Sequence, residues 1–148
     1  MALGVARGTI DDFMALPANK VARGAAKPMR ENNVVQAQLA IATAKLRSAR
    51  YNLHNTLDEA WAYVEQHGDM TLDHKAMIRL ASTWAIQNAR DVVNMLYHAA
   101  GSVAIFEEQP FERRLRDIHT IAQQAQGRQL HFETVGQVLL GMAPENAF

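Results

Sequence analysis

The chain has 148 residues, the size of one ordinary domain, and a domain of this length can bury a complete hydrophobic core without disulfides or metals. It contains no cysteine, which excludes disulfides, thiolate metal sites and cysteine nucleophiles. Its 15 basic and 15 acidic side chains give zero net charge, which argues against nucleic acid or an anionic membrane as a partner and permits self-association.

The apolar stretches are short and are interrupted by charged or amide side chains, so we expect no membrane span. The first residues lack the long apolar centre of a signal peptide, because Arg7, Asp11 and Asp12 break it. We therefore predict a cytoplasmic protein.

The composition favours helices over strands. Ala, Leu and Gln are abundant, only 4 residues are proline, and alternating Val, Ile and Thr are scarce. We predict an all-α fold, an up-and-down four-helix bundle with a short additional C-terminal helix, that forms a single domain over residues 1–148.

The first predicted helix begins almost at the first residue. Its apolar face consists of residues at spacings of three and four: Leu3, Ala6, Ile10 and Phe13. No capping side chain precedes this face, so we expect the chain to be a piece of a longer protein.

A loop is predicted over residues 18–33, after Pro17. A loop of this length is uncommon inside a compact domain unless it has a function. It carries four basic residues: Lys20, Arg23, Lys27 and Arg30. These side chains either lie on a solvated surface or contact an anion such as a phosphate.

Two long helices follow this loop. Apolar residues recur every three or four positions over residues 34–64, which predicts a rod of roughly 45 Å that ends at Gly68. A second helix carries an apolar face over residues 77–99 and stops near Gly101. Because only a brief turn joins the two helices, we expect them to pack antiparallel.

Two shorter helices complete the prediction. Pro110 lies where the first turn of a helix accepts proline, and the helix that follows is expected to close at Gly127. The last helix runs from about His131 to Leu140 and ends at Gly141.

Several common chemistries of such folds have no sequence signature here. None of the histidines has a glutamate three residues before it, which argues against a di-metal bundle site. No Gly-x-Ser-x-Gly elbow, GxGxxG or P-loop pattern occurs either. We therefore expect no metal site and no nucleotide binding by those loops.

The most informative segment is 99–120, which reads AAGSVAIFEEQPFERRLRDIHT. It combines a glycine helix stop, a proline helix start and a dense charge cluster. This segment resembles the C-terminal helical domain of the acyl-CoA dehydrogenase superfamily, in which a Gly-rich turn precedes Pro, Glu-Arg and Arg-Asp at this spacing. The matching residues are Pro110, Glu112, Arg113, Arg116 and Asp117.

The resemblance extends over nearly the whole chain. Residues 3–7 (LGVAR) are similar to the opening helix of the family, and residues 36–40 (QAQLA) to the start of its second helix. Residues 116–120 (RDIHT) and 132–141 resemble the branch that contains flavin-dependent monooxygenases. The N-terminal helical domain and central β domain of such enzymes are absent, so the chain resembles their C-terminal third.

The resemblance implies a role for this domain. In the family it forms the core of a tetramer and completes the flavin site, often that of a neighbouring subunit. Carried over by residue, this implies that Arg23 contacts the flavin phosphates, although the Arg-x-x-Phe-Gly motif of the family is not intact. It also implies that the turn at Gly101 and Ser102 offers backbone groups to FAD or FMN.

The catalytic positions depart from the family pattern. Ala125 stands where the dehydrogenases place a glutamate base, and Gln124 stands where the monooxygenase branch places a histidine. Neither side chain exchanges a proton near pH 7. His119 lies one turn earlier and either faces the same pocket or serves as a structural partner. We therefore name His119 and Gln124 as the candidate catalytic residues.

The charged residues of the motif also have a purely structural explanation. Glu112 and Arg116 are spaced for an ion pair within one helix, which would contribute about 0.3–0.5 kcal/mol. We expect these charges to anchor the domain interface rather than to bind a ligand.

Two functions remain open from the sequence. The first is the C-terminal domain of an acyl-CoA dehydrogenase-like flavin-dependent oxidoreductase or monooxygenase, inactive as an isolated chain, with acyl-CoA or an aromatic compound as substrate. The second is a stand-alone, non-catalytic helical scaffold. Both predict a homo-oligomer, a dimer or a tetramer, because exposed apolar positions such as Val103, Ile105 and Phe106 have surface to bury.

Overall fold

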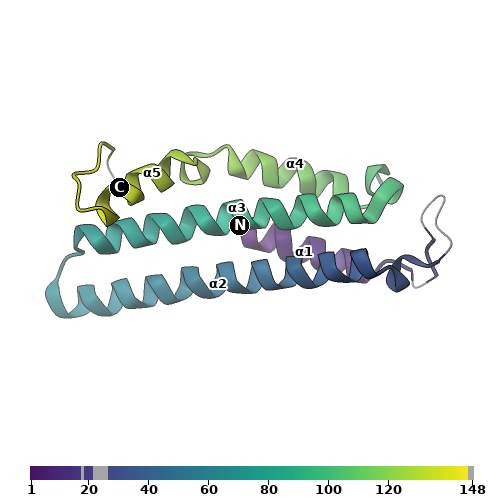
Figure 1. Ribbon diagram of the computed structural model, residues 1–148, viewed down its shortest axis with the longest axis horizontal. Helices are drawn as coiled ribbons and strands as arrows, with labels where there is room; N and C mark the ends of the chain where they lie inside the picture. The colour runs from purple at the N-terminus through teal and green to yellow at the C-terminus, as the bar shows by residue number, and fades with distance from the viewer. Residues whose placement is uncertain (18, 22–26, 147–148) are drawn as a thin grey trace.

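The computed structural model describes residues 1–17, 19–21 and 27–146. These residues form an elongated helical bundle, which confirms the predicted all-α fold with its short last helix (Figure 1). Its elements are α1 (Ala2–Met14), α2 (Asn33–His67), α3 (Leu72–Ala100), α4 (Phe111–Ala122) and α5 (Leu130–Leu139), with 3-10 turns at Met29–Glu31, Gly101–Ile105 and Ala125–Gly127.

Helices α2 and α3 form the antiparallel hairpin on which the other helices pack (Figure 1). The Oδ1 atom of Asn32 caps α2 by accepting a hydrogen bond from the Val34 amide at 2.9 Å. The helix ends at Gly68, whose φ of 83° is left-handed, as glycine readily allows. Thr71 then caps α3 by accepting from the His74 amide at 3.3 Å.

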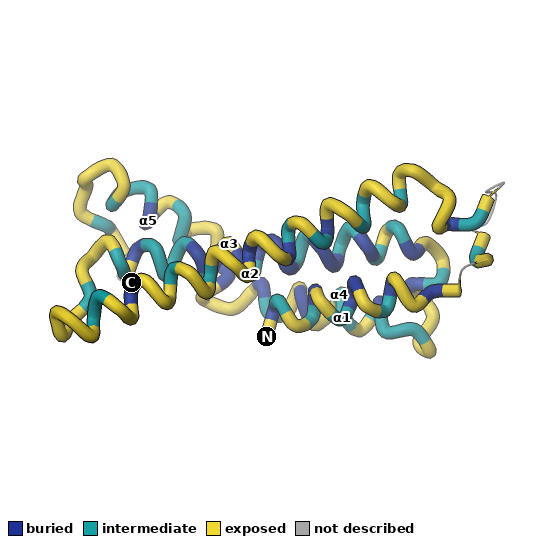
Figure 2. The backbone as a smooth tube through the Cα atoms, turned by 90° about the horizontal axis from the view of Figure 1, so that it is seen from below, coloured by how far each residue is buried: buried dark blue, intermediate teal, exposed yellow. Residues whose placement is uncertain are grey.

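One half of the bundle contains all four main helices. Helix α1 packs on the first part of α2 and the last part of α3, α4 packs on α3 and on α1, and together these helices enclose the main core. Buried positions recur along this half in Figure 2. Each large apolar side chain buried here contributes about 1.5–3 kcal/mol. The largest fully buried members are Val92, Val93, Leu96, Phe111 and Ile118.

The other half contains α5 and the remaining parts of α2 and α3. Helix α5 packs on α3 through the buried side chains of Thr134 and Val135. The last part of α2 contacts α3 on one side only, and the side chains of Leu57 and Trp61 are 43% and 67% exposed. Within the described residues, none of the helices has the length and apolar run that a membrane crossing requires.

The fourth helix is shorter than the sequence predicts. The sequence predicts that it closes at Gly127, but α4 ends at Ala122 and residues Ala125–Gly127 form a separate 3-10 turn. The amide of Gln124 bonds back to the Ile121 carbonyl at 3.1 Å, which tightens the chain out of the α-helical pattern. Glycine is required at 127 for a different reason, because a Cβ there would lie 2.5 Å from the Ala122 carbonyl oxygen.

Candidate functional site

An open cleft lies where the end of α1 and the loop after it meet the turn that ends α3. Its volume is about 880 Å³, and we call it the turn cleft. Asp12, Leu16 and Lys20 line one side, and Gly101, Ser102 and Pro110 line the other. The structure thus brings together two residues predicted for the flavin site, Gly101 and Ser102, with one basic residue of the predicted loop.

Gly101 shapes the wall of this cleft. Its backbone has φ 63° and ψ −145°, a conformation open to glycine and strained for residues with a Cβ. Its amide bonds the His98 carbonyl and so ends α3, after which Ser102 begins a 3-10 turn at the exposed surface. A ligand can therefore approach the backbone here without meeting a side chain at position 101.

Lys20 is the basic residue among the described residues that line the turn cleft. Its Nζ donates a hydrogen bond to the Ala100 carbonyl at 3.1 Å and so links the loop to the end of α3. Burial lowers the pKa of the Lys20 ammonium from its usual 10.5. The sequence marks Lys20 only as one of four basic loop residues, and it points instead to Arg23, which lies outside the described residues.

Arg30, another basic residue of the loop, has a structural role. Its Nη2 donates to the carbonyls of Met14 and Leu16 at 3.1 and 3.0 Å, which satisfies acceptors at the end of α1. Its guanidinium is thus directed to the backbone of its own chain.

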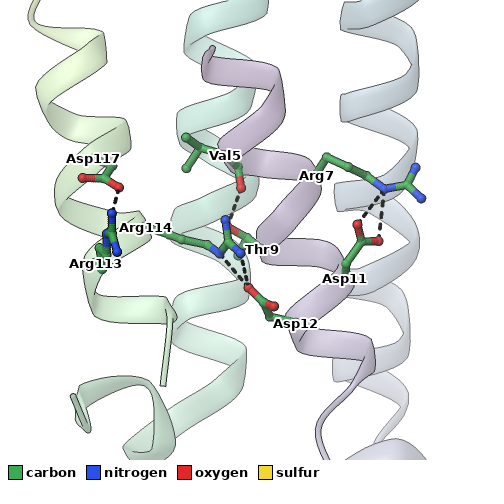
Figure 3. A network of polar contacts seen from close by, with 8 residues as sticks. All are labelled: Val5, Arg7, Thr9, Asp11, Asp12, Arg113, Arg114 and Asp117. Carbon is green, nitrogen blue, oxygen red and sulfur yellow. Dashed lines mark hydrogen bonds and ion pairs between the residues drawn. The ribbon is translucent and has the colours of Figure 1, made fainter. Parts of the chain in front are cut away.

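A charge pair between α1 and α4 lies at the edge of the turn cleft (Figure 3). The Nε and Nη2 atoms of Arg114 both lie 2.6 Å from Oδ2 of Asp12, and both side chains are about two-thirds buried. Gly8 makes this geometry possible, because a Cβ at Gly8 would meet the guanidinium of Arg114. Arg114 is therefore the residue of the charge cluster that anchors one helix to another.

The other arginines of the cluster pair within α4. Arg116 Nε lies 2.7 Å from Oε1 of Glu112, and Arg113 lies 3.9 Å from Asp117. Their side chains are largely exposed. The prediction of an intrahelical pair between Glu112 and Arg116 is confirmed.

A second, smaller pocket of about 330 Å³ contains one candidate catalytic residue. We call it the Gln124 pocket. Among the described residues that line it, the side chains are apolar or neutral. Gln124 and Gln126 supply amides and Ser82 a hydroxyl, while the apolar lining consists of Met1, Ala2, Leu3, Leu53, Ala85, Ile86 and Ile121.

The other candidate catalytic residue lies elsewhere. His119 is exposed, and its Nε2 lies 3.0 Å from Oδ1 of Asn94 on α3. It is not among the residues that line the Gln124 pocket. The structure therefore places Gln124 in a pocket and gives His119 a partner on the neighbouring helix.

The structure is a helical domain in which the turn cleft and the Gln124 pocket are both open to the surface. The model of the family described as "Acyl-CoA dehydrogenase, C-terminal domain" matches residues 1–128, and the chain belongs to this family. The resemblance seen in the sequence is thereby confirmed.

Relatives with similar sequences point to one branch of the family. The chain is 26% identical over 142 residues to an indole-3-acetate monooxygenase from Pseudomonas putida, a match that covers 96% of this chain and 36% of that protein. It is 25% identical, over the same shares, to an indole-3-acetate monooxygenase from Acinetobacter baumannii. The chain thus spans about a third of the length of the relatives it matches.

Solved structures agree on the fold. A 3-HSA hydroxylase from Rhodococcus sp. RHA1 matches 98% of this chain with a TM-score of 0.85 and 17% identity, over 36% of its own length. XiaF from Streptomyces sp., solved with FADH2 and glycerol, matches 99% of this chain with a TM-score of 0.90 and 15% identity, over 37% of its length. At these identities the likeness shows the fold alone.

Proposed function

We propose that this chain is the C-terminal domain of a flavin-dependent monooxygenase and that it completes the flavin site and drives self-association. The turn cleft is the observation that carries this proposal. It combines a glycine turn that allows close approach to the backbone, a partly buried ammonium at Lys20, and apolar surface at Leu16. When bound, a flavin supplies the redox chemistry of the reaction.

The described residues fit one end of such a cofactor. Among the described residues the Lys20 ammonium donates to the Ala100 carbonyl, and an ammonium group carries three donors, which suits a phosphate of the kind that both FAD and FMN carry. Gly101 and Ser102 offer backbone and hydroxyl groups beside it. Arg23 stays a prediction as a second phosphate contact, and the choice between FAD and FMN stays open.

The side chains of the Gln124 pocket favour a substrate from which this domain does not have to remove a proton. Its neutral amides can hydrogen-bond a polar group, and its aliphatic side chains suit a flat apolar ring. The similar relatives are named for indole-3-acetate, an aromatic compound. We therefore favour an aromatic substrate over acyl-CoA, with Gln124 in contact with it. His119 stays a candidate catalytic residue.

A flavin titration followed by NMR tests the turn cleft. FAD should shift the amides of Lys20, Gly101 and Ser102, and Lys20→Met should weaken these shifts several-fold. Riboflavin, which lacks the phosphate, should produce weak shifts in both variants. Shifts confined to other residues would contradict the proposal. Stoichiometric retention of yellow FAD by the chain alone would contradict its dependence on the missing domains.

Self-association is proposed from the exposed apolar side chains of α2 and α3. Tyr51, Trp61 and Trp84 are 73%, 67% and 47% exposed, and the chain carries no net charge to oppose association. Light scattering should report a dimer or tetramer, and Trp61→Ala should shift it toward monomer at equal concentration. A strict monomer at high micromolar concentration would refute this part.

A second candidate is a non-catalytic scaffold that associates without a flavin. Gln124 and Ala125, where the family places its acid–base residues, favour it. An oligomer that shows no FAD-dependent shifts in the turn cleft would support the scaffold. A cytoplasmic location stays a prediction under both functions.

A further inference from the structure

The segment 123–128, between α4 and α5, is held by side chains through three consecutive carbonyls. His131 Nε2 faces the Ala125 carbonyl at 2.5 Å, and Thr83 Oγ1 donates to the Gln126 carbonyl at 3.0 Å. Gln87 Nε2 donates to the Gly127 carbonyl at 2.6 Å. The latter two donors come from α3, which packs against every other helix of the bundle, so they tie the segment to the centre of the bundle.

Gln87 has a buried side-chain oxygen that lacks a hydrogen-bond partner among the described residues, which is energetically unfavourable. Its side chain is 8% exposed, and its Oε1 is a buried side-chain oxygen with no hydrogen-bond partner among the described residues. The amide nitrogen must face the segment, because the group presented there is a carbonyl. A buried acceptor left unpaired is unfavourable, so a glutamine here is explained by its donor rather than by the stability of the core.

Thr83, one turn before Gln87 on α3, also donates a hydrogen bond to the segment. It is fully buried, and its hydroxyl bonds the segment rather than a carbonyl of its own helix. Neighbouring polar residues of α3 behave differently. Ser82 donates to the Arg79 carbonyl and Asn88 to the Trp84 carbonyl, both within α3. Only some polar residues of this stretch are therefore directed at the segment.

Segment 123–128 contributes two residues to the lining of the Gln124 pocket. The side chains of Gln124 and Gln126 line that pocket, while the carbonyls of 126 and 127 point to α3. Gly127 adds a steric constraint, because the backbone at this residue lies against the Ala122 carbonyl. The segment thus follows one path, and that path sets where the two amides lie.

We infer that Gln87 and Thr83 are positioning residues that hold segment 123–128 and thereby place Gln124 in its pocket. They act through the backbone and do not line the pocket themselves. The catalytic meaning of this arrangement rests on the proposed function, whereas the arrangement itself belongs to the isolated chain and can be tested without a flavin or substrate.

Amide hydrogen exchange measured by NMR on the full chain is the direct test. The amide of Gly127 bonds the Gln124 carbonyl within the segment, and the amide of Gln124 bonds the Ile121 carbonyl at the end of α4, so the exchange of both reports the opening of the segment. Gln87→Met should accelerate their exchange at least tenfold and leave core amides such as Val93 within twofold. Thr83→Val should act in the same direction, and Thr83→Ser, which keeps the hydroxyl, should restore slow exchange.

Asn88→Leu is the matched control, since it removes a buried amide of the same helix that, among the described residues, bonds the Trp84 carbonyl within α3. It should leave the exchange of the segment unchanged. Nuclear Overhauser contacts from the Gln124 side chain to the Ala85 and Ile86 methyls should weaken in Gln87→Met and persist in Asn88→Leu. Equal acceleration at Val93 and Gly127, or unchanged contacts of Gln124, would overturn the inference, whatever the flavin titration shows.

Discussion

The two halves of the bundle differ in how completely they bury the same pair of helices. In the half with α1 and α4, Leu96, Phe111 and Ile118 are at most 1% exposed. In the half with α5, Val135 is the fully buried large side chain of that helix, and α2 leaves Leu57 and Trp61 exposed. We call these the closed half and the open half.

The difference divides one hairpin into two environments. In the closed half, α1 and α4 cover the hairpin and the buried residues form a continuous core. In the open half, α2 packs on α3 and leaves Trp61 67% exposed. The turn cleft lies at the end of the closed half, and the Gln124 pocket lies between the halves, where α4 gives way to α5.

The largest expected difference comes from a matched pair of leucine truncations. Leu96→Ala, in the closed half, should lower the free energy of unfolding by about 2–5 kcal/mol, because it removes fully buried atoms and leaves a cavity. Leu57→Ala, in the open half, should change it by about 0.5 kcal/mol or less at low protein concentration. Urea unfolding followed by circular dichroism measures both. Equal losses would show that the halves do not differ in stability.

The charge pair between α1 and α4 should give the next largest effect. Arg114→Ala leaves Asp12 partly buried and unpaired, and should destabilise the closed half by about 1–2 kcal/mol. Arg113→Ala, one residue away and 81% exposed, is the control and should change stability by about 0.5 kcal/mol or less.

Gly8→Ala offers an independent test of the same pair, because its Cβ would displace the Arg114 guanidinium without removing either charge. Urea unfolding, at low and at high salt, should show a lower free energy of unfolding for Arg114→Ala and for Gly8→Ala than for wild type. If Gly8→Ala were stabilising, as alanine ordinarily is inside a helix, the close contact with Arg114 would be wrong.

The sequence predicts the positions of the helices better than it predicts where α4 ends. Apolar spacing and the glycines at 68, 101 and 141 place the helices, since periodicity and helix stops are local signals. The end of α4 is missed because tertiary contacts decide it. The carbonyls of Gln126 and Gly127 bond Thr83 and Gln87, some 40 residues earlier in the chain, and no local pattern announces such partners.

The residues of the candidate sites also divide into those found from local sequence signals and those found only from tertiary contacts. Gly101 and Ser102 are found from the family motif, because the motif is contiguous. Lys20 joins them only in space, through its bond to the Ala100 carbonyl, so its role needs the fold. Arg114 is likewise hidden among neighbouring arginines, because the sequence does not show that it alone of the cluster reaches Asp12 across the helix boundary.

The turn at the tip of the open half should respond less than the charge pair. Gly68→Ala forces a residue with a Cβ into a left-handed conformation, φ 83°, and should lower the free energy of unfolding by about 1 kcal/mol. Gly4→Ala is the control, because Gly4 is exposed in α1 with open space around it, and should raise stability by about 0.5–1 kcal/mol. Thermal unfolding should shift in opposite directions, and a loss in both would contradict this reading of the turn.

The smallest effect concerns the pH dependence of stability through Lys20. Burial lowers its pKa in the folded chain below the 10.5 of the unfolded chain, so the unfolded state binds more protons between these two values. The contribution of Lys20 to the free energy of unfolding should therefore rise with pH through this window. Urea unfolding from neutral pH to about pH 10.5 should show wild type gaining on Lys20→Met, while Lys75→Met, which removes an exposed lysine, should track wild type. The difference in the free energy of unfolding between wild type and Lys20→Met could instead fall as the pH rises. The folded chain would then stabilise the charged form of Lys20 rather than desolvate it, and Lys20 would be a paired cation that is not available to a ligand.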